Sequence, residues 1–408
     1  MNFIKLSIVQ KRTVVSYQCK FPGIKMEGPR GTKKEEFDQV LKLVNYVFRQ
    51  SNNRGPNNMG KRYPLLFNDD NLENMRIILE DNKPVSHIGI SETEIAVYGC
   101  RTKIGSIGSV CTHPEYRKRG FATLLLENAM KKIDDDGADI MLVSGGHSLY
   151  KKAGCIEAGR VHKFRISRND LKKFYAQTMR VFPYKEKNLE NIVGVYQKEA
   201  VRFSRPLEDF KRILTTGVAM DRKAEILTIH KAGEFLGYLA VQSPEEKEGK
   251  EGVSNVAEYS GIRKAILDAV KPIFNRYDIQ GLSFNIPFHD TEFIHALKEK
   301  DFKSKIENIP GTIKIINFPR LMDRFRPYIE ERLGKKTSDL IRFNQKRDRF
   351  TIGFDGEEFN TDARGLVQIV FGTSGEEEKK IMPKKGKITK ILADIFPLPF
   401  IWSGLNYI

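Results

Sequence analysis

The segment from Val110 to Ala122 combines residues that could together bind a phosphate group. It reads Val-Cys-Thr-His-Pro-Glu-Tyr-Arg-Lys-Arg-Gly-Phe-Ala, so a strand-like end precedes a turn, three consecutive basic residues and the start of a helix. Backbone NH groups are unpaired at a helix N-terminus, and the helix dipole places partial positive charge there. Gly120 has no side chain, which lets an anion approach the main chain closely. The segment therefore predicts a pyrophosphate site at a helix N-terminus.

The spacing Arg117-x-x-Gly120-x-Ala122, placed after Val-x-Thr-x-Pro, resembles the acyl-coenzyme A loop of the GNAT superfamily of N-acetyltransferases. This resemblance implies acetyl-coenzyme A as co-substrate, with no metal ion. It also implies a set of coenzyme-binding residues, of which the first three would act mainly through their main chain: Val110, Cys111, Thr112, Arg117, Lys118, Arg119, Gly120, Phe121, Ala122 and Thr123.

The sequence around the loop predicts the elements that would hold it in place. Strands are expected at 75–80, 84–90, 94–98 and 106–112, because these stretches are apolar and separated by turn residues. After the loop, apolar residues recur at helical spacing and predict one amphipathic helix: Ala122, Leu125, Leu126, Ala129, Met130 and Ile133. A buried strand at 140–143 and a short helix at 148–153, ended by Gly154, follow. This order is the one that the acetyltransferase fold requires.

Tyr150 is the predicted proton donor. It precedes Gly154 in Leu-Tyr-Lys-Lys-Ala-Gly-Cys, which resembles the Tyr-x-x-x-Gly-aromatic segment of the family, where the phenol lies near the coenzyme sulfur. Cys155 replaces the usual aromatic residue. The alternative is an amphipathic side chain that packs its ring at a domain boundary.

The middle of the chain resembles a second copy of the same domain. A strand is expected at 238–241, an apolar helical stripe runs from Ile262 to Ile273, and strand, helix and strand are expected at 281–286, 291–300 and 311–317. Pro272 interrupts the stripe, and an accidental match of two amphipathic helices is the alternative. No Arg-x-x-Gly-x-Ala occurs, and residues 243–252 carry glutamates that would repel a pyrophosphate. The copy is therefore predicted to be degenerate.

The last third has a different pattern. A helix is expected at 319–333, a hairpin at 350–354 and 357–360, a strand at 366–371, an exposed loop at 372–387 and an apolar tail at 391–408. The whole arrangement resembles the bacterial enhanced-intracellular-survival-type (Eis-like) acetyltransferases. It implies an α+β, α/β sandwich-like protein with a catalytic GNAT domain at 1–165, a degenerate GNAT-like domain at 166–317 and a sterol-carrier-protein-like domain at 318–408. Homo-oligomers are typical of this group.

The sequence offers several candidates for the general base. An alkylammonium has a pKa of about 10.4, so a base or a proton wire is needed near neutral pH. No carboxylate lies between Ser106 and Cys111, where many acetyltransferases have a glutamate. The Eis-like resemblance points instead to the α-carboxylate of Ile408, brought back to the first domain by the apolar tail. Five side chains remain as alternatives: Glu92, Glu94, His87, His113 and His147.

Composition limits the class of protein. The 408 residues include 69 Lys and Arg against 52 Asp and Glu, a net charge of +17, but the basic residues are dispersed and no nucleic-acid motif is present. Most of this excess is therefore expected to be solvated surface rather than a groove for a polymer. The four cysteines lack the spacing of a zinc site or a disulfide framework, and no apolar run is long enough for a membrane span. A cytoplasmic protein without membrane partners is expected.

Two functions from different classes fit these features. The first is an acetyl-coenzyme A-dependent N-acetyltransferase that transfers the acetyl group to a primary amine, of a small molecule or a peptide, by direct attack in a ternary complex. The second is a non-catalytic acyl-coenzyme A or lipid-binding regulatory protein. Tyr150 favours the enzyme, because a binding protein would have no need for a proton donor.

Overall fold

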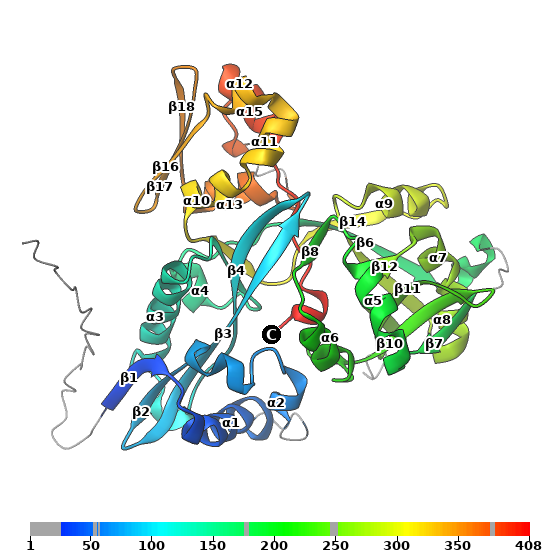
Figure 1. Ribbon diagram of the computed structural model, residues 1–408, viewed down its shortest axis with the longest axis horizontal. Helices are drawn as coiled ribbons and strands as arrows, with labels where there is room; N and C mark the ends of the chain where they lie inside the picture. The colour runs from blue at the N-terminus through cyan, green and yellow to red at the C-terminus, as the bar shows by residue number, and fades with distance from the viewer. Residues whose placement is uncertain (1–25, 52–54, 56–57, 175–178, 245–251, 376–379) are drawn as a thin grey trace, which may run out of the picture.

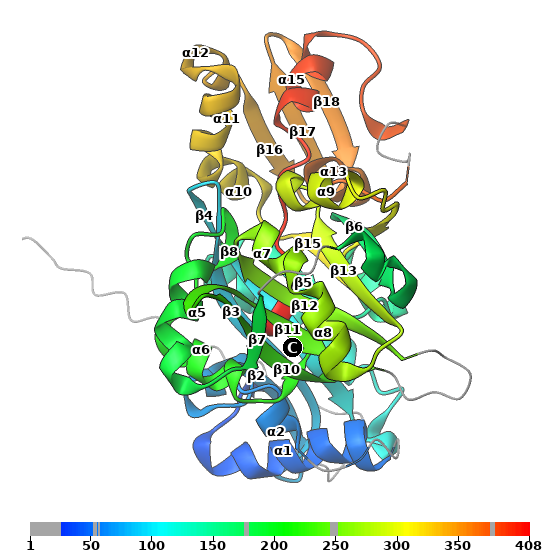
Figure 2. The same cartoon turned by 90° about the vertical axis from the view of Figure 1, so that its right-hand side faces the viewer.

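The computed structural model describes residues 26–51, 55, 58–174, 179–244, 252–375 and 380–408. Three sheets, each with its own helices, build the molecule. Figure 1 shows most of the first sheet in blue to teal, most of the second in green to yellow, and the third body in gold, orange and red. After a turn of 90° the third body stands at one end of the other two (Figure 2). The predicted mixed α+β class is confirmed.

The first sheet has the order β1-β2-β3-β4-β5-β15, with β8 added to β3. Its pairs are antiparallel except β4–β5, which is parallel. The strands are β1 (Met26–Gly31), β2 (Met75–Glu80), β3 (Lys83–Val97), β4 (Cys100–Thr112), β5 (Ile140–Val143), β8 (Val201–Phe203) and β15 (Thr312–Ile315). The two strands expected at 84–90 and 94–98 are one continuous strand, because the polar residues between them stay paired with β4.

Four helices accompany the first sheet: α1 (Phe37–Asn45), α2 (Met59–Arg62), α3 (Phe121–Asp135) and α4 (Ser148–Lys152). The predicted stripe of α3 faces the sheet, with Leu125, Leu126, Ala129 and Ile133 fully buried. Packing of this stripe fixes the helix axis and hence the position of its N-terminus, which follows β4 after a single 3-10 turn at Pro114–Tyr116.

The second sheet has the order β14-β6-β13-β12-β11-β10-β7, again with one parallel pair, β12–β13. Its strands are β6 (Arg160–Ser167), β7 (Arg180–Pro183), β9 (Val218–Ala219, paired with β10), β10 (Arg222–Lys231), β11 (Glu234–Gln242), β12 (Val253–Gly261), β13 (Gly281–Pro287) and β14 (Ser304–Asn308). Its helices are α5 (Leu189–Tyr196), α6 (Leu207–Leu214), α7 (Arg263–Asp268), α8 (Val270–Tyr277) and α9 (Thr291–Lys298).

The prediction of one continuous helix from Ile262 to Ile273 is wrong, because the structure has two helices there. The stripe is split into α7 and α8 at Ala269. Pro272 lies in the first turn of α8, where its missing NH costs no helical hydrogen bond. Most of the acidic loop expected at 243–252 lies outside the described residues.

The two large sheets exchange strands. β6 follows β5 and α4 in the chain, yet it pairs with β13 and β14 of the second sheet. β15 follows the second sheet, yet it pairs with β5 of the first. A cut between residues 165 and 166 would pass through β6. The first sheet therefore takes its edge strand β15 from a segment that follows the second sheet, whereas β6 lies inside the second sheet between β14 and β13.

The third body holds β16 (Arg342–Lys346), β17 (Arg349–Phe354), β18 (Glu357–Asp362), α10 (Phe318–Arg324), α11 (Arg326–Leu333), α12 (Lys335–Ser338), α13 (Ala363–Phe371) and α15 (Lys387–Ile395). The predicted hairpin is confirmed as β17–β18. The helix expected at 319–333 is divided at Phe325, with Pro327 in the first turn of α11.

The strand expected at 366–371 is wrong, because this segment is helix α13. The Asp362 carboxylate accepts a hydrogen bond from the Gly365 NH at 2.8 Å and caps the helix. All residues from Gly365 to Phe371 are buried, including the polar Gln368, so this part of the helix is enclosed on every side. The loop expected at 372–387 extends partly outside the described residues.

After α15 the chain leaves the third body and ends between the two large sheets (Figure 1). The tail is anchored by apolar side chains along its length: Leu398, Phe400, Ile401, Leu405 and Ile408 are all buried. No helix among the described residues is long and apolar enough to cross a bilayer.

Candidate active site

The N-terminus of α3 is open and suited to an anion. Gly120 is its N-cap residue, with φ of +84° and ψ of 0°, a left-handed conformation that favours glycine. No side chain caps the helix, so the NH groups of its first turn are available to a ligand. A Cβ atom on Gly120 would meet no atom within 4 Å, so backbone conformation rather than space calls for glycine here.

The three basic residues of the loop have different roles in the structure. Arg119 makes a bidentate ion pair with the buried Glu80 carboxylate, with Nη2–Oε1 at 2.5 Å and Nη1–Oε2 at 3.1 Å, and its guanidinium lies 4.8 Å from the centre of the Phe121 ring. Its charge is therefore balanced within the protein, and the pair ties the loop to β2. Arg117 and Lys118 are exposed, so they present the positive charge to solvent.

The parallel strands β4 and β5 separate beside this loop. Their pairing ends at Ile107 and Val143, whereas β4 continues to Thr112 with β3 as its neighbour. A bulge follows at once, where Ser109 has φ of +53°. The separated strands leave backbone polar groups of β4 without a neighbouring strand on the β5 side.

His87 contacts the backbone of the β4 bulge at Ser109. Its Nδ1 atom lies 2.9 Å from the Ser109 carbonyl oxygen, a distance at which an Nδ1–H group donates to that oxygen. The side chain is fully buried, and this burial lowers its pKa to about 4. The imidazole is thus neutral near pH 7 and holds the backbone of β4 in place.

The C-terminal carboxyl group lies at the same strand separation. A Cβ atom on Gly108 would lie 2.8 Å from the carboxyl carbon of Ile408, so the two backbones are in direct contact. The Ile408 side chain is buried in a cluster that includes Val44 and Cys111. The Tyr407 phenol is hydrogen-bonded to Ser144, the first residue after β5. The tail therefore bridges β4 and the end of β5 at the point where the two strands separate.

A cavity of about 200 Å³ opens beside the carboxyl group. Residues from both large sheets and from the tail line it: Phe48, Arg49, Met59, Tyr63, Leu66, Ser109, Ser144, Asp221, Tyr407 and Ile408. The Ser109 Oγ atom is buried and has no hydrogen-bond partner among the described residues. The lining is thus mainly aromatic and apolar, with a few polar groups in it.

Asp221 closes this cavity from the turn between β9 and β10. Its Oδ1 atom accepts hydrogen bonds from Tyr63 Oη and Arg62 Nη2, both at 2.8 Å, and it lies 3.1 Å from Arg49 Nη2. Burial alone would raise the pKa of the Asp221 carboxyl, but these donors lower it below its ordinary value. Asp221 is therefore a carboxylate at neutral pH, and burial together with its charge raises the pKa of Tyr63.

Tyr150 lies on α4 in the apolar cluster below the strand separation, together with Ile107, Phe121 and Val143. Burial raises its pKa to about 12, with a smaller contribution from Cys155, so the phenol keeps its proton at neutral pH. Its hydroxyl has no hydrogen-bond partner among the described residues. Tyr150 is not one of the residues that line the cavity of Ile408.

The alternative bases lie elsewhere. His113 is stacked on Tyr46 with ring centres 5.1 Å apart, and His147 is the N-cap residue of α4. Glu94 pairs with Arg101 at 2.7 Å. None of these lines the cavity.

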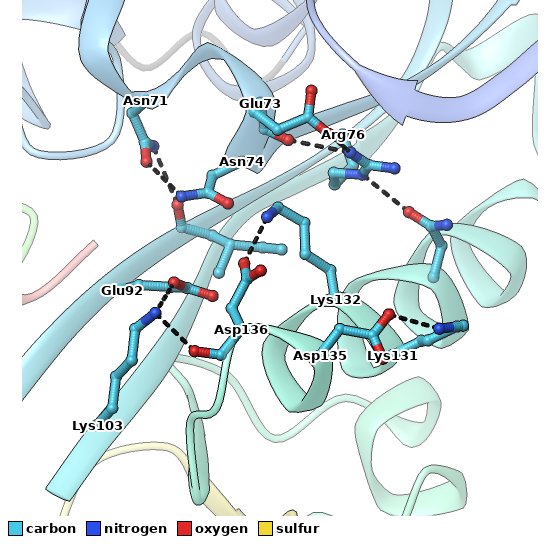
Figure 3. A network of polar contacts seen from close by, with 12 residues as sticks. Asn71, Glu73, Asn74, Arg76, Glu92, Lys103, Lys131, Lys132, Asp135 and Asp136 are labelled. Carbon is cyan, nitrogen blue, oxygen red and sulfur yellow. Dashed lines mark hydrogen bonds and ion pairs between the residues drawn. The ribbon is translucent and has the colours of Figure 1, made fainter. Parts of the chain in front are cut away.

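Glu92 belongs to a polar network beside the C-terminal end of α3 (Figure 3). Its carboxylate pairs with Lys103, whose Nζ atom also donates to the Asp136 carbonyl oxygen at 3.1 Å. Burial raises the pKa of Glu92, yet the network lies away from the cavity and ties β3 and β4 to the helix. A raised carboxyl pKa therefore marks a structural group here.

Arg49 and Asp221 are site residues that the sequence did not indicate. Asp221 belongs to a turn in which both Met220 and Asp221 have positive φ, and nothing in its local sequence distinguishes it from any other acidic turn residue. Only the packing of the second sheet against the first brings these residues together.

The helix N-terminus without a side-chain cap lies next to parallel strands that separate. Residues 29–157 match the family model of the acetyltransferase (GNAT) domain. The chain therefore contains a GNAT acetyltransferase domain and is an acyl-transfer enzyme, as the loop predicted.

Solved structures share the fold over nearly the whole chain. A GCN5-related N-acetyltransferase from Anabaena variabilis is 15% identical, with a TM-score of 0.62 over 93% of this chain and 98% of that one. One from Kribbella flavida is 13% identical, with a TM-score of 0.59 over 93% and 99%. Eis1 from Mycobacterium abscessus is 11% identical, with a TM-score of 0.59 over 92% and 98%. No protein of curated function matches the sequence.

Proposed function

We propose that the protein is an acetyl-coenzyme A-dependent N-acetyltransferase that acetylates a primary amine by direct attack in a ternary complex. The observation that carries this proposal is the contact between the Ile408 carboxyl and Gly108. It places a carboxylate at the separation of β4 and β5, beside a cavity of a size suited to a small acceptor.

The residues present fit the coenzyme. The first-turn NH groups of α3 (Phe121, Ala122 and Thr123) would hold the pyrophosphate, with Arg117 and Lys118 adding charge. The main chain of Val110, Cys111 and Thr112 would hold the pantetheine arm and the thioester carbonyl. Acetyl-coenzyme A supplies the acetyl group as an activated thioester.

Ile408 is the proposed general base. Its carboxylate would accept the proton of the incoming ammonium group. Asp221 lines the same cavity, but Arg49 and Arg62 balance its charge, so the negative charge that we assign to catalysis is that of Ile408. A carboxylate in a largely apolar cavity favours a cationic acceptor, which must lose a proton before its nitrogen can attack the acyl carbon. The new C–N bond then forms as the C–S bond breaks.

Tyr150 is the proposed general acid. A phenol with a pKa of about 12 is fully protonated at neutral pH and can give its proton to the departing thiolate. A proton from solvent then restores the phenol. Cys155, whose pKa burial raises to about 11, stays a neutral neighbour.

The rest of the chain would shape and close the site. We propose that the second sheet is a degenerate GNAT-like domain, because its parallel pair β12–β13 follows a meander as β4–β5 does in the first sheet. The third body would be sterol-carrier-protein-like, as the Eis-like resemblance implies, and the protein a homo-oligomer. Light scattering after size exclusion measures the oligomer directly.

The test is release of free thiol from acetyl-coenzyme A with a panel of polyamines, arylalkylamines, aminoglycosides and lysine peptides. The proposal predicts amine-dependent release and an acetylated amine detectable by mass spectrometry. Coenzyme binding without release on any amine would contradict it and favour the regulatory protein.

A further inference from the structure

The tail that ends at Ile408 is held by the second sheet before it reaches the first. The Trp402 Nε1–H group donates to the Ala257 carbonyl oxygen at 2.6 Å, and the Leu405 NH donates to Glu258 Oε2 at 3.0 Å. Gly404 has φ of +50°, and a Cβ atom there would lie 2.3 Å from Glu258 Oε2. The tail is thus fitted closely to one carboxylate of β12.

That carboxylate belongs to a buried ion pair. Arg205 donates to Glu258 through Nη1 at 2.8 Å and Nη2 at 2.5 Å, and its Nε donates to Asn406 Oδ1 at 2.5 Å. The Tyr238 hydroxyl donates to Glu258 Oε1 at 2.7 Å, and the Arg205 guanidinium lies 4.1 Å from the centre of the Tyr196 ring. Both charges are fully buried, and each holds a different residue of the tail.

The two sheets receive the tail at corresponding positions. In the second sheet, parallel pairing ends at Val256 and Phe284, and the next residue of β12, Ala257, accepts the bond from Trp402. In the first, parallel pairing ends at Ile107 and Val143, and the next residue of β4 contacts Ile408. The tail therefore lies at the strand separation of the second sheet, and its last residue brings a carboxylate to the strand separation of the first sheet.

We propose that Glu258 and Arg205 are positioning residues that set the place of the Ile408 carboxylate in the first sheet. A buried ion pair is weak evidence for stability, because apolar residues of similar volume often replace one without loss. This pair instead makes hydrogen bonds to Leu405 and Asn406, which lie just before the end of the chain. The proposal rests on the proposed role of Ile408 as base.

The experiment measures kcat and the KM for acetyl-coenzyme A for Asn406→Ala and Glu258→Gln, each in the full chain and in a chain that ends at Tyr407. If the substitutions displace the base, kcat of the full chain should fall on the order of 10- to 100-fold, and the KM for acetyl-coenzyme A should stay within about twofold of the wild-type value. In the shortened chain, which has already lost the base, neither substitution should lower kcat further.

Glu225→Gln is the matched control. Glu225 lies on β10 of the same sheet and forms an ion pair with Arg276 of α8 at 2.7 Å, so kcat of Glu225→Gln should stay at the wild-type level. Glu258→Gln leaves a buried charge uncompensated; if it fails to fold, Asn406→Ala decides the question, because it removes only one acceptor.

A folded Asn406→Ala variant with wild-type kcat would overturn the proposal. A further fall in kcat when either substitution is made in the chain that ends at Tyr407 would also overturn it, because the residues would then have a general structural role. Full activity of the shortened chain would instead overturn the proposed base, a separate result.

Discussion

The carboxyl group of Ile408, the last residue of the chain, lies against the backbone of Gly108 at the point where β4 leaves β5. The Ile408 side chain packs into the core of the first domain, and the residues before it are held by the second sheet. The chain end is therefore part of the candidate active site, and both large sheets hold it in position.

Gly108→Ala tests this contact directly. The new methyl group would lie 2.8 Å from the Ile408 carboxyl carbon, so the tail must shift. We expect kcat to fall on the order of 10- to 100-fold, because displacement of a catalytic group by about 1 Å is that costly. Gly105→Ala is the control: its methyl would press on the Ile133 side chain at 2.7 Å, which should cost about 1–3 kcal/mol of stability without loss of kcat. Equal kcat in both variants would contradict the account.

Tyr150→Phe keeps the buried ring and removes the proposed acid. The loss of general acid catalysis should lower kcat by about 10²- to 10⁴-fold, while the Kd for acetyl-coenzyme A measured by calorimetry stays within a few fold. Because the phenol has a pKa of about 12, the wild-type rate should not decline between pH 7 and 10 through loss of this proton. A phenylalanine variant with wild-type turnover would remove Tyr150 from the mechanism.

Gly120→Ala and Gly137→Ala form a matched pair at the two ends of α3. Both glycines have positive φ, +84° and +80°, and a Cβ atom on either would meet no atom within 4 Å. Each substitution should therefore cost about 1–2 kcal/mol of stability through backbone strain. Only Gly120→Ala should weaken acetyl-coenzyme A binding, by roughly tenfold, because only that end would meet the pyrophosphate. Equal Kd values for the two variants would argue against the phosphate site.

His87 should make stability depend on pH. Its pKa is about 4 in the folded protein against an ordinary 6.5, so the unfolded chain binds this proton first as pH falls. The contribution, about 3 kcal/mol, is fully present above pH 6.5 and is lost as pH falls toward 4. His87→Asn keeps an NH donor for the Ser109 carbonyl but does not titrate. Its apparent melting temperature should fall less than that of the wild type between pH 6.5 and 4; parallel curves would show that His87 is not the cause. His289, whose pKa burial also lowers to about 4, titrates in both proteins.

Local patterns were enough to predict the phosphate loop and the elements around it. The spacing of Arg117, Gly120 and Ala122 and the apolar stripe of α3 depend on a few neighbouring residues, and the structure has the helix where they indicate. The segment 366–371 is predicted as a strand because a run of six residues, rich in branched apolar side chains, is too short to separate a strand from a buried helix; the structure has a helix there.

Long-range packing could not be predicted in the same way. The exchange of β6 and β15 between sheets depends on pairing partners far away in the chain. Asp221 and Glu258 are single acidic residues in ordinary surroundings, and their roles arise only where a turn or a strand of the second sheet meets the tail.

The most direct test of the account is the turnover of a chain that ends at Tyr407, compared with the full chain and with Ile408→Val. The measurement is amine-dependent thiol release at saturating acetyl-coenzyme A. Loss of the terminal residue should lower kcat by about 10²- to 10⁴-fold, as expected for a general base, whereas Ile408→Val, which keeps the α-carboxylate, should stay near the wild-type rate. Equal turnover of the shortened and full chains would contradict the assignment of the chain end as the base.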